Sequence, residues 1–396
     1  MTLKQNRLLS TLLITEGRDP KYSAGFVNIP PYRGSTVLFD SMDSLEEARG
    51  YRLYGRLGNP TSRGLERALS SISGAYNAIL TPSGMNAIAI TLLALLKSGD
   101  HVLVVDSVYP STREFCDTVL RDLGVSVTYY DPDLNEKIEP LIKTNTALIY
   151  VESPGSGTFE LQDIPAVCEI ARKHSIPVVA DNTWATPLYF PAIHRGVDVE
   201  IHALTKYVVG HSDGMLGVIL PASQDLYRKI RIYYNALGIT VGPDVTYLAA
   251  RGLRSLAARI KMHQDNAQVV ADWLVQQDVV QEVVWPALPS SPYHDVWKRD
   301  FSGASSLFGL RLKPEIAKEN IRHMLNSLQL FHLGYSWGGY ESLIMDYHAP
   351  SGRQHHPFDT KSHYLRLHIG LESSFDLIED LSNGFKLLRA SATQST

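Results

Sequence analysis

Apolar residues along the middle of this chain alternate between short runs typical of buried strands and longer periodic segments typical of helices. Strand-like runs cover residues 77–81, 101–106, 125–130, 146–152 and 176–181. Helical segments lie between them at 85–97, at 113–123 and between 130 and 146, and Asp163 is expected to cap a helix that runs to His174. This alternation predicts an α/β fold with a mostly parallel sheet and helices on both of its faces.

The pattern changes at both ends of the chain. The first 58 residues contain Pro20, Pro30 and Pro31 and show little periodicity. Beyond Gly252 come a long helical stretch (255–277), strand-like runs (282–285, 305–312, 364–369) and two further helices (315–328, 375–388). We therefore expect an N-terminal arm (1–58), a large α/β domain (59–254) and a smaller C-terminal α/β domain (255–396). Residues 351–362 are predicted to form a surface loop.

Composition narrows the class of protein. The chain has 396 residues, 44% hydrophobic and 20% charged, and a formal net charge of −4 with histidine counted as neutral. That balance provides no basic surface for nucleic acid or for an anionic membrane. Cys116 and Cys168 are the only cysteines, so neither a disulfide framework nor a CxxC metal site is expected. Residues 1–20 lack a secretory signal and the apolar stretch 88–96 is too short to span a bilayer, which favours a cytoplasmic protein.

Asp181 and Lys206 stand at the ends of two strand-like runs, residues 176–182 and 197–207. A lysine amine that forms an imine with an aldehyde, and a carboxylate that keeps a pyridine nitrogen protonated, are the two groups that pyridoxal 5'-phosphate (PLP) chemistry requires. Strand-end Asp and Lys residues are common, so the pair needs support from the rest of the chain.

A phosphate site is the first such support. Ser83, Gly84 and Met85 join a strand to a helix, where unpaired N–H groups and the positive end of the helix dipole favour an anion. Thr205, beside Lys206, could add a hydroxyl donor. An ordinary turn between strand and helix is the alternative.

Two further residues carry candidate roles. Tyr109, placed at the end of a strand, could stack on the pyridine ring, or could be a half-buried tyrosine without function. Arg366 lies in an apolar strand pattern and needs an anionic partner if it is buried, for which an amino-acid carboxylate is suited. A structural salt bridge or a solvated face is the alternative. Tyr54 and Arg56, in the arm, could complete the phosphate site or could be solvated.

These motifs occur in an order that resembles the Cys/Met-metabolism family of PLP enzymes over nearly the whole chain. The matching segments are Tyr54–Arg56, Ser83–Met85, Asp181–Trp184, Thr205–Asp213, Tyr335–Ser342 and Leu365–His368. The resemblance implies PLP as cofactor and the PLP-dependent transferase-like (aspartate aminotransferase-type, fold type I) architecture, with a mostly parallel seven-stranded sheet in the large domain.

Two details of the resemblance point to one branch. Residues 152–157 read Glu-Ser-Pro-Gly-Ser-Gly where many members read Glu-Ser-Pro-x-Asn-Pro, and Trp337 follows Ser336 where γ-acting members usually carry leucine. Both features are similar to the bacterial cystathionine β-lyase branch, which serves methionine biosynthesis. A broader cysteine-S-conjugate or cystine β-lyase, or a γ-synthase or γ-lyase, remains open. Ala203 departs from the common Ser-x-Thr-Lys pattern and removes one phosphate hydroxyl.

The resemblance also implies roles for individual residues. Lys206 would bind PLP and act as general base, and Tyr109 would assist it. Ser336, Trp337 and Arg366 would hold the substrate carboxylate of L-cystathionine. The family assembles as a homotetramer built from two dimers, so Tyr54 and Arg56 would reach the cofactor phosphate of a neighbouring subunit. A protein that only binds or regulates would not need this complete set.

Overall fold

The computed structural model describes residues 7–50, 53–348, 352–355 and 363–389. Its centre is a seven-stranded sheet in the order β1-β7-β6-β5-β4-β2-β3. The strands are β1 (Ile79–Thr81), β2 (His101–Val105), β3 (Ser126–Tyr130), β4 (Thr146–Glu152), β5 (Val178–Asp181), β6 (Val199–Ala203) and β7 (Gly217–Pro221). Only β7 runs against the others, because it pairs antiparallel with both β1 and β6. The mostly parallel seven-stranded sheet expected from the sequence is confirmed.

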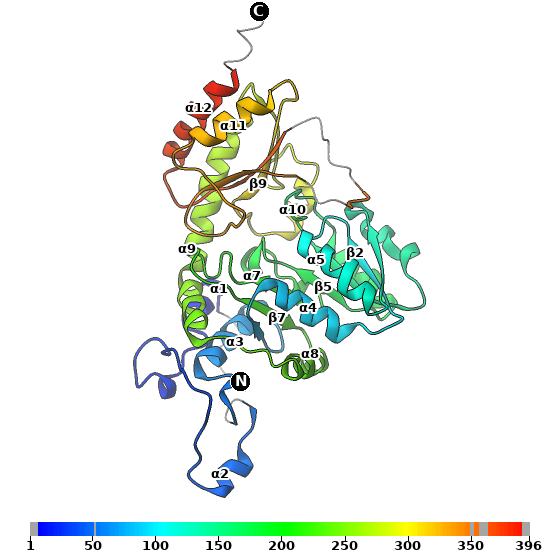
Figure 1. The fold of residues 1–396 in the computed structure, drawn as a ribbon, viewed down its shortest axis with the longest axis vertical. Helices are drawn as coiled ribbons and strands as arrows, with labels where there is room; N and C mark the ends of the chain where they lie inside the picture. Colours follow the sequence, from blue (N-terminus) through cyan, green and yellow to red (C-terminus); the bar gives the residue numbers. More distant parts are fainter. Residues whose placement is uncertain (1–6, 51–52, 349–351, 356–362, 390–396) are drawn as a thin grey trace, which may run out of the picture.

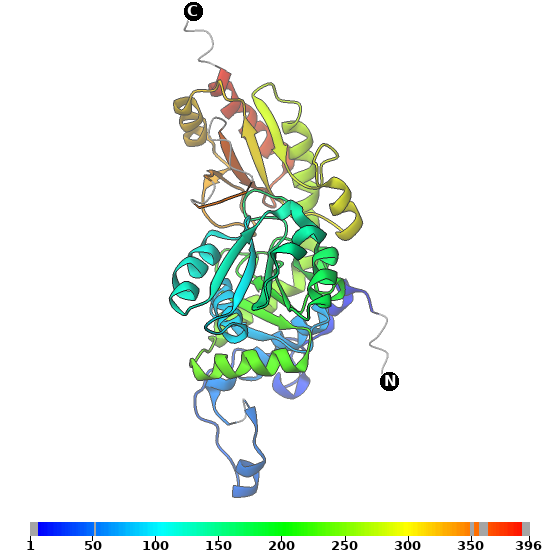
Figure 2. The same ribbon diagram turned by 90° about the vertical axis from the view of Figure 1, so that its right-hand side faces the viewer.

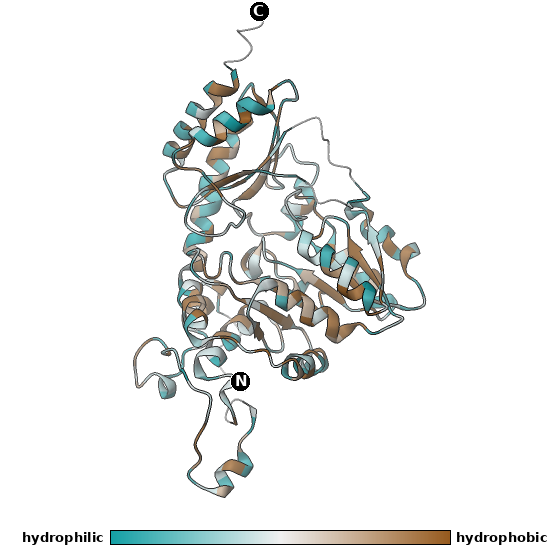
Figure 3. Cartoon of the chain, viewed as in Figure 1, coloured by the Kyte–Doolittle hydropathy of each residue, from teal (hydrophilic) through white to brown (hydrophobic). Residues whose placement is uncertain are grey.

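Helices cover both faces of this sheet (Figure 1, Figure 2). They are α3 (Pro60–Ser73), α4 (Gly84–Leu95), α5 (Pro110–Phe115), α6 (Ile164–Lys173), α7 (Thr186–Tyr189), α8 (Gln224–Ala236) and the first part of α9 (Pro243–Leu274). Because side chains alternate along a strand, Ile79 and Ile219 share one apolar cluster with α4, whereas Leu80 and Val218 share another with α3 and α9. Most strand residues are therefore apolar, and many of the covering helices carry apolar and polar residues on different sides, as Figure 3 shows by hydropathy.

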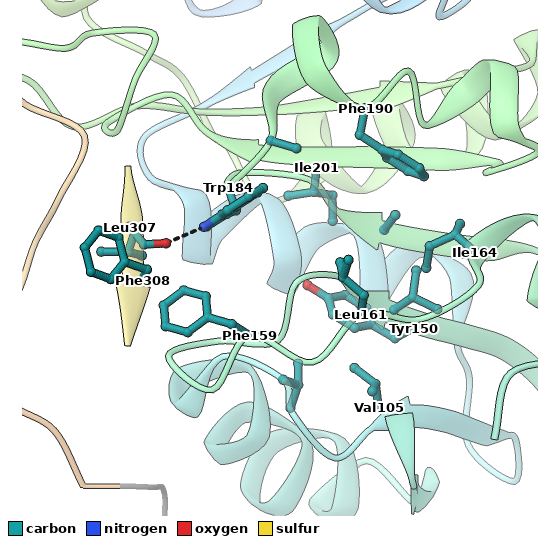
Figure 4. Packing of buried hydrophobic residues seen from close by; sticks show 14 of the residues in the cluster. Val105, Tyr150, Phe159, Leu161, Ile164, Trp184, Phe190, Ile201, Leu307 and Phe308 are labelled. Atoms are coloured by element: carbon teal, nitrogen blue, oxygen red, sulfur yellow. Dashed lines mark hydrogen bonds between the residues drawn. The ribbon is translucent and has the colours of Figure 1, made fainter. Parts of the chain in front are cut away.

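The C-terminal part contains a five-stranded sheet in the order β10-β11-β12-β9-β8. Its strands are β8 (Val280–Val284), β9 (Leu307–Leu312), β10 (His332–Leu333), β11 (Leu343–Asp346) and β12 (Tyr364–His368), with helices α10 (His294–Asp300), α11 (Lys318–Ser327) and α12 (Ser374–Arg389). Trp184 joins the two parts: its Nε1 donates to the carbonyl of Leu307 at 3.0 Å, among packed aromatic and aliphatic side chains (Figure 4).

The N-terminal arm reaches away from this body (Figure 1). It carries α1 (Leu9–Thr15), α2 (Met42–Glu47) and the 3₁₀ turns Pro20–Tyr22 and Gly55–Leu57. α1 is anchored, since Leu13 is fully buried, but α2 buries none of its residues and Leu38 is 90% exposed. The segment that carries α2 is therefore not held by the core of its own chain.

Several sequence predictions need correction. The expected helix between residues 130 and 146 is a 3₁₀ segment, Pro132–Leu141, interrupted at Asn135, and prolines 132 and 140 remove backbone donors there. The strands β7, β10 and β11 were not predicted. The long helix begins at Pro243 rather than at 255, so the expected boundary at 254/255 falls inside α9 and the division into domains stays a prediction. The predicted loop 351–362 lies mostly outside the described residues. No helix in the described part of the chain is long and apolar enough to cross a membrane.

Candidate active site

A solvent-open cavity with about 1100 Å³ of empty space lies at the carboxyl ends of β4, β5 and β6, facing β12 and the loop before β11. Parallel strands direct the groups that follow them to this edge, which is where ligands of open α/β sheets bind. The cavity is lined by Ser83, Gly84, Met85, Tyr109, Glu152, Ser156, Asp181, Thr183, Thr205, Lys206, Tyr335, Trp337 and Arg366, among others.

Asp181 ends β5 and is fixed from one side. Its Oδ1 accepts from the backbone N–H of Thr183 at 3.0 Å and from the Thr183 hydroxyl at 2.6 Å, and that hydroxyl in turn accepts from the Ala203 N–H. Burial raises the pKa of the Asp181 carboxyl, while Thr183, His202 and Lys206 favour its charged form. A buried carboxylate of this kind is stabilised by a cation presented from the cavity.

Lys206 follows β6 and enters the same cavity. Its Nζ donates to Ser336 Oγ at 2.8 Å and lies 5.0 Å from the centre of the Trp337 ring. Burial, followed by the positive charge of Arg366, lowers the pKa of Lys206 to about 8, and Asp181 acts in the opposite direction. The amine is therefore substantially neutral at mildly alkaline pH, which is the form that attacks an aldehyde.

The N-terminus of α4 forms one end of the cavity. Ser83 caps the helix, because its Oγ accepts from the Asn86 N–H at 3.1 Å, and the first N–H groups of α4 remain without intrahelical partners. A Cβ on Gly84 would lie 2.6 Å from Ala203 Cβ, so only glycine allows this close approach. The Thr205 hydroxyl is already engaged, since it donates to the Leu216 carbonyl and accepts from the Leu216 N–H. To donate to a phosphate, it would have to give up the first of these bonds.

Tyr109 lines the cavity but does not end a strand. β2 ends at Val105, and Tyr109 is the residue that precedes α5, with 42% of its surface exposed. Its backbone N–H donates to Glu152 Oε2 at 2.7 Å, which places the ring at the mouth of the cavity. The prediction that Tyr109 ends a strand is wrong, because three residues separate it from the end of β2. Its expected location in the site is observed.

Arg366, on β12, has no carboxylate within ion-pair distance in the described part of the chain. Its Nη2 donates to the Tyr335 carbonyl at 2.6 Å and to the Gly334 and Ser336 carbonyls at 3.3 Å. Burial lowers its pKa, which remains that of a cation. The structural salt bridge considered above is therefore not what holds Arg366, and its remaining donors can bind an anion in the cavity.

The loop that carries Ser336 and Trp337 is fastened to β12 by His368. The His368 Nε2 accepts from the Gly338 N–H at 3.1 Å, and its Nδ1 lies 3.2 Å from Ser306 Oγ. Burial lowers the pKa of His368 well below its usual value, so the ring is neutral and can accept that hydrogen bond. One strand therefore orients both Arg366 and the loop beside Lys206.

Tyr54 and Arg56 do not line the cavity of their own chain. Tyr54 is 46% exposed, and Arg56 Nη1 donates to the Asn235 carbonyl at 3.2 Å. Glu152, Thr183 and Tyr335 also line the cavity, although the sequence did not indicate them as site residues. Glu152 could have been found, since it ends a predicted strand in the same way as Asp181.

The cavity fits PLP by the chemistry of its groups. The helix end at Ser83, Gly84 and Met85 suits a phosphate, the buried carboxyl of Asp181 suits the nitrogen of a pyridinium, and Lys206 provides an amine in the same cavity. A type I PLP-dependent enzyme is the class that this fold and this set of groups define.

Comparison with known proteins agrees. The family described as "Cys/Met metabolism PLP-dependent enzyme" matches residues 10–386, and the chain belongs to that family. Cystathionine beta-lyase MetC of Escherichia coli K12 is 38% identical, over 96% of this chain and 98% of that protein. The L-alanine/L-glutamate racemase of Wolbachia pipientis wMel is also 38% identical, over 94% and 95%. The crystal structure of metB from Corynebacterium glutamicum superposes with a TM-score of 0.89 at 29% identity, over 98% and 100%. PLP is accordingly the cofactor of this chain.

Proposed function

We propose that this chain is a cystathionine β-lyase, which splits L-cystathionine by α,β-elimination into L-homocysteine, pyruvate and ammonia. The observation that carries the proposal is the position of Lys206 Nζ, 2.8 Å from Ser336 Oγ, in a cavity that is also lined by Asp181 and by Arg366, which forms no ion pair with a carboxylate among the described residues. The proposal is supported by relatives named cystathionine β-lyase, which align with this chain over almost their whole length.

Arg366 would bind the substrate α-carboxylate through the guanidinium donors that the loop carbonyls leave free. Ser336 and Trp337 belong to the loop that those carbonyls come from, so carboxylate binding also orders the residues beside Lys206. The carboxylate contact orients the Cα–H bond toward the lysine amine.

When bound, PLP supplies the electron sink that stabilises negative charge at the substrate Cα. The holding residues would be the α4 end at Ser83, Gly84 and Met85 with Thr205 for the phosphate, Asp181 for the ring nitrogen, Tyr109 for the ring face and Lys206 for the aldehyde carbon. Once the substrate amine has displaced it from the aldehyde carbon, Lys206 is a free neutral amine and would take the α-proton. As the Cβ–S bond breaks, the sulfur receives a proton from Lys206, assisted by Tyr109, and hydrolysis of the three-carbon fragment releases pyruvate and ammonia.

The arm would complete the site of a second copy of the chain, in a homotetramer built from two dimers. The segment of the arm that carries α2 is not held by the core of its own chain, and Tyr54 and Arg56 do not line their own cavity. Both residues are therefore available to reach the cofactor phosphate of a neighbouring subunit. The cytoplasmic location expected from the sequence stays a prediction.

The test is a visible spectrum of the purified protein followed by addition of L-cystathionine, with pyruvate, 2-oxobutyrate and both thiols measured together. We expect cofactor absorbance and equal amounts of pyruvate and homocysteine. 2-Oxobutyrate with cysteine would instead move the chain to the γ-cleaving branch. Turnover by Lys206→Ala at the wild-type rate would refute the role of that lysine.

A further inference from the structure

Two carboxyl groups stand side by side in the cavity, and the proposed reaction uses only one of them. Glu152 ends β4 and Asp181 ends β5, and the two residues are register partners in neighbouring parallel strands. Register partners direct their side chains to the same face of a sheet, and both residues line the cavity. Negative charges on register partners in a desolvated site repel each other, so the pair favours a single charge.

The surroundings of the two groups differ. Asp181 accepts two hydrogen bonds from Thr183, and His202 and Lys206 favour its charged form. Glu152 receives one N–H, from Tyr109, and a hydrogen bond with the Ser156 side chain, and the charged group that acts on it is Asp181, another anion. Two phenols, Tyr150 on β4 and Tyr347 after β11, also face this carboxyl group.

These surroundings act differently on the pKa values of the two carboxyl groups. Burial raises the pKa of both carboxyls, but for Glu152 the charge of Asp181 adds to burial and raises it well above its usual value. The charge of the pair is thus favoured on Asp181 and the proton on Glu152. Pairs of carboxyls separated in this way by their surroundings carry different protonation states at one pH.

We propose that Glu152 is a further positioning residue of the cofactor site and acts there as a neutral carboxylic acid. Its Oε2, which accepts the Tyr109 N–H at 2.7 Å, is the carbonyl oxygen, and Oε1 carries the proton. In this form Glu152 anchors the backbone of Tyr109, the ring-stacking residue, without adding a second negative charge beside Asp181. The single negative charge of the pair then lies on Asp181, where it would act on the ring nitrogen of PLP. This inference rests on the cofactor site of the proposed function and extends it.

The experiment is infrared difference spectroscopy of the holoenzyme at neutral pH, wild type minus Glu152→Gln, with and without ¹³C-glutamate labelling. We expect a protonated-carboxyl C=O band that is absent from the variant and shifts with the label. In Asp181→Asn the same band should be lost on titration at a lower pH than in wild type, because a neighbouring negative charge has been removed. PLP affinity is measured in parallel: Glu152→Gln should retain most of it, and Glu152→Ala should lose more than tenfold.

Two results would overturn the inference: no glutamate band assignable to position 152, or equal PLP affinities for the Gln and Ala variants. Glu200→Gln is the matched control. Glu200 is fully buried on β6, but its carboxyl group contacts His202 on the same strand and Asn182, the residue after β5. Removing the Glu200 carboxyl should leave the band in place. Neither readout depends on cystathionine. A protein with the band but another substrate would refute the proposed function alone, and pyruvate production without the band would refute this inference alone.

Discussion

Lys206 and Arg366 line the same cavity, and the positive charge of Arg366 lowers the pKa of the Lys206 amine. The neutral amine of Lys206 is the form that captures an aldehyde, and its pKa is lowered to about 8 by burial and by Arg366. Below that pH the amine is protonated, so it cannot attack. We therefore expect the rate constant of PLP capture by cofactor-free protein to rise through about pH 8 and to level off above it, as followed by stopped-flow absorbance.

The control for this pH dependence is Arg366→Ala. Removing a nearby positive charge makes the protonated amine less costly, so the inflection should move to higher pH. A wild-type rate that kept rising to pH 10, as for an unperturbed lysine, would contradict the assignment.

Arg366 itself allows a second prediction. Because its guanidinium bonds to backbone carbonyls and to no carboxylate in the described part of the chain, its function is expected to lie with the substrate anion. Losing one partner of a desolvated charge pair costs about 2–5 kcal/mol, so Arg366→Ala should lower kcat/KM for L-cystathionine by roughly 30- to 5000-fold. The visible spectrum of bound PLP serves as the control and should persist. An unchanged kcat/KM would exclude the carboxylate contact.

At the residue scale, sequence reasoning identified the groups but not all of their partners. Asp181, Lys206, Tyr109 and Arg366 were predicted, and the fold brings them to one cavity. That the Thr205 hydroxyl is engaged by Leu216 could not be predicted, because that bond joins positions 11 residues apart across a loop.

At the scale of elements, the path of the loop between β10 and β11 requires a glycine at position 338. Gly338 has φ +85°, and a Cβ there would lie 2.9 Å from the Lys206 backbone. Gly338→Ala should therefore displace Ser336 and Trp337 from Lys206 and reduce kcat/KM at least tenfold. Gly99→Ala is the matched control: Gly99 has φ +87°, but nothing lies within 4 Å of its Cβ position.

Both substitutions place alanine in the left-handed region and should cost about 1–2 kcal/mol in stability. Thermal unfolding and steady-state kinetics of the two variants separate the effects. If Gly338→Ala lost stability and kept its activity, as Gly99→Ala is expected to do, the loop would not position the residues beside Lys206.

The elements also explain an error in the sequence analysis. Gly252 was taken as the point where the pattern changes, yet it lies within α9. A Cβ on Gly252 would meet the carbonyl oxygens of Val208 and Val209 at 2.2 and 2.4 Å. The glycine thus marks a close approach between α9 and the segment after Lys206, not the start of a helix, and this contact was invisible without the tertiary fold.

At the scale of the whole molecule, the arm makes a prediction about assembly. If Arg56 acts on a neighbouring subunit, Arg56→Ala and Lys206→Ala should each be nearly inactive and should complement each other when mixed. Random mixing pairs the two variants in half of the dimers, and one of the two sites in such a dimer is intact, so about a quarter of wild-type activity should return.

The measurement is pyruvate production after the two variants are denatured and refolded together, compared with each variant refolded alone. Recovery from the mixture and none from either variant would support shared sites. No recovery, with oligomers of normal size, would place Arg56 in the site of its own chain and refute the arrangement.

By itself, the sequence determined the class of fold, the order of the motifs and the chemistry of the central groups. Strand and helix periodicity, and residues such as Asp181 and Lys206, depend on local pattern and side-chain chemistry, which are legible in one dimension. Only the tertiary structure decided which groups meet: Glu152 beside Asp181, His368 behind the loop, and Gly252 against the Lys206 segment. Such contacts join positions far apart in the chain, and their geometry is set by strand register and close approach of the backbone, which no local pattern encodes.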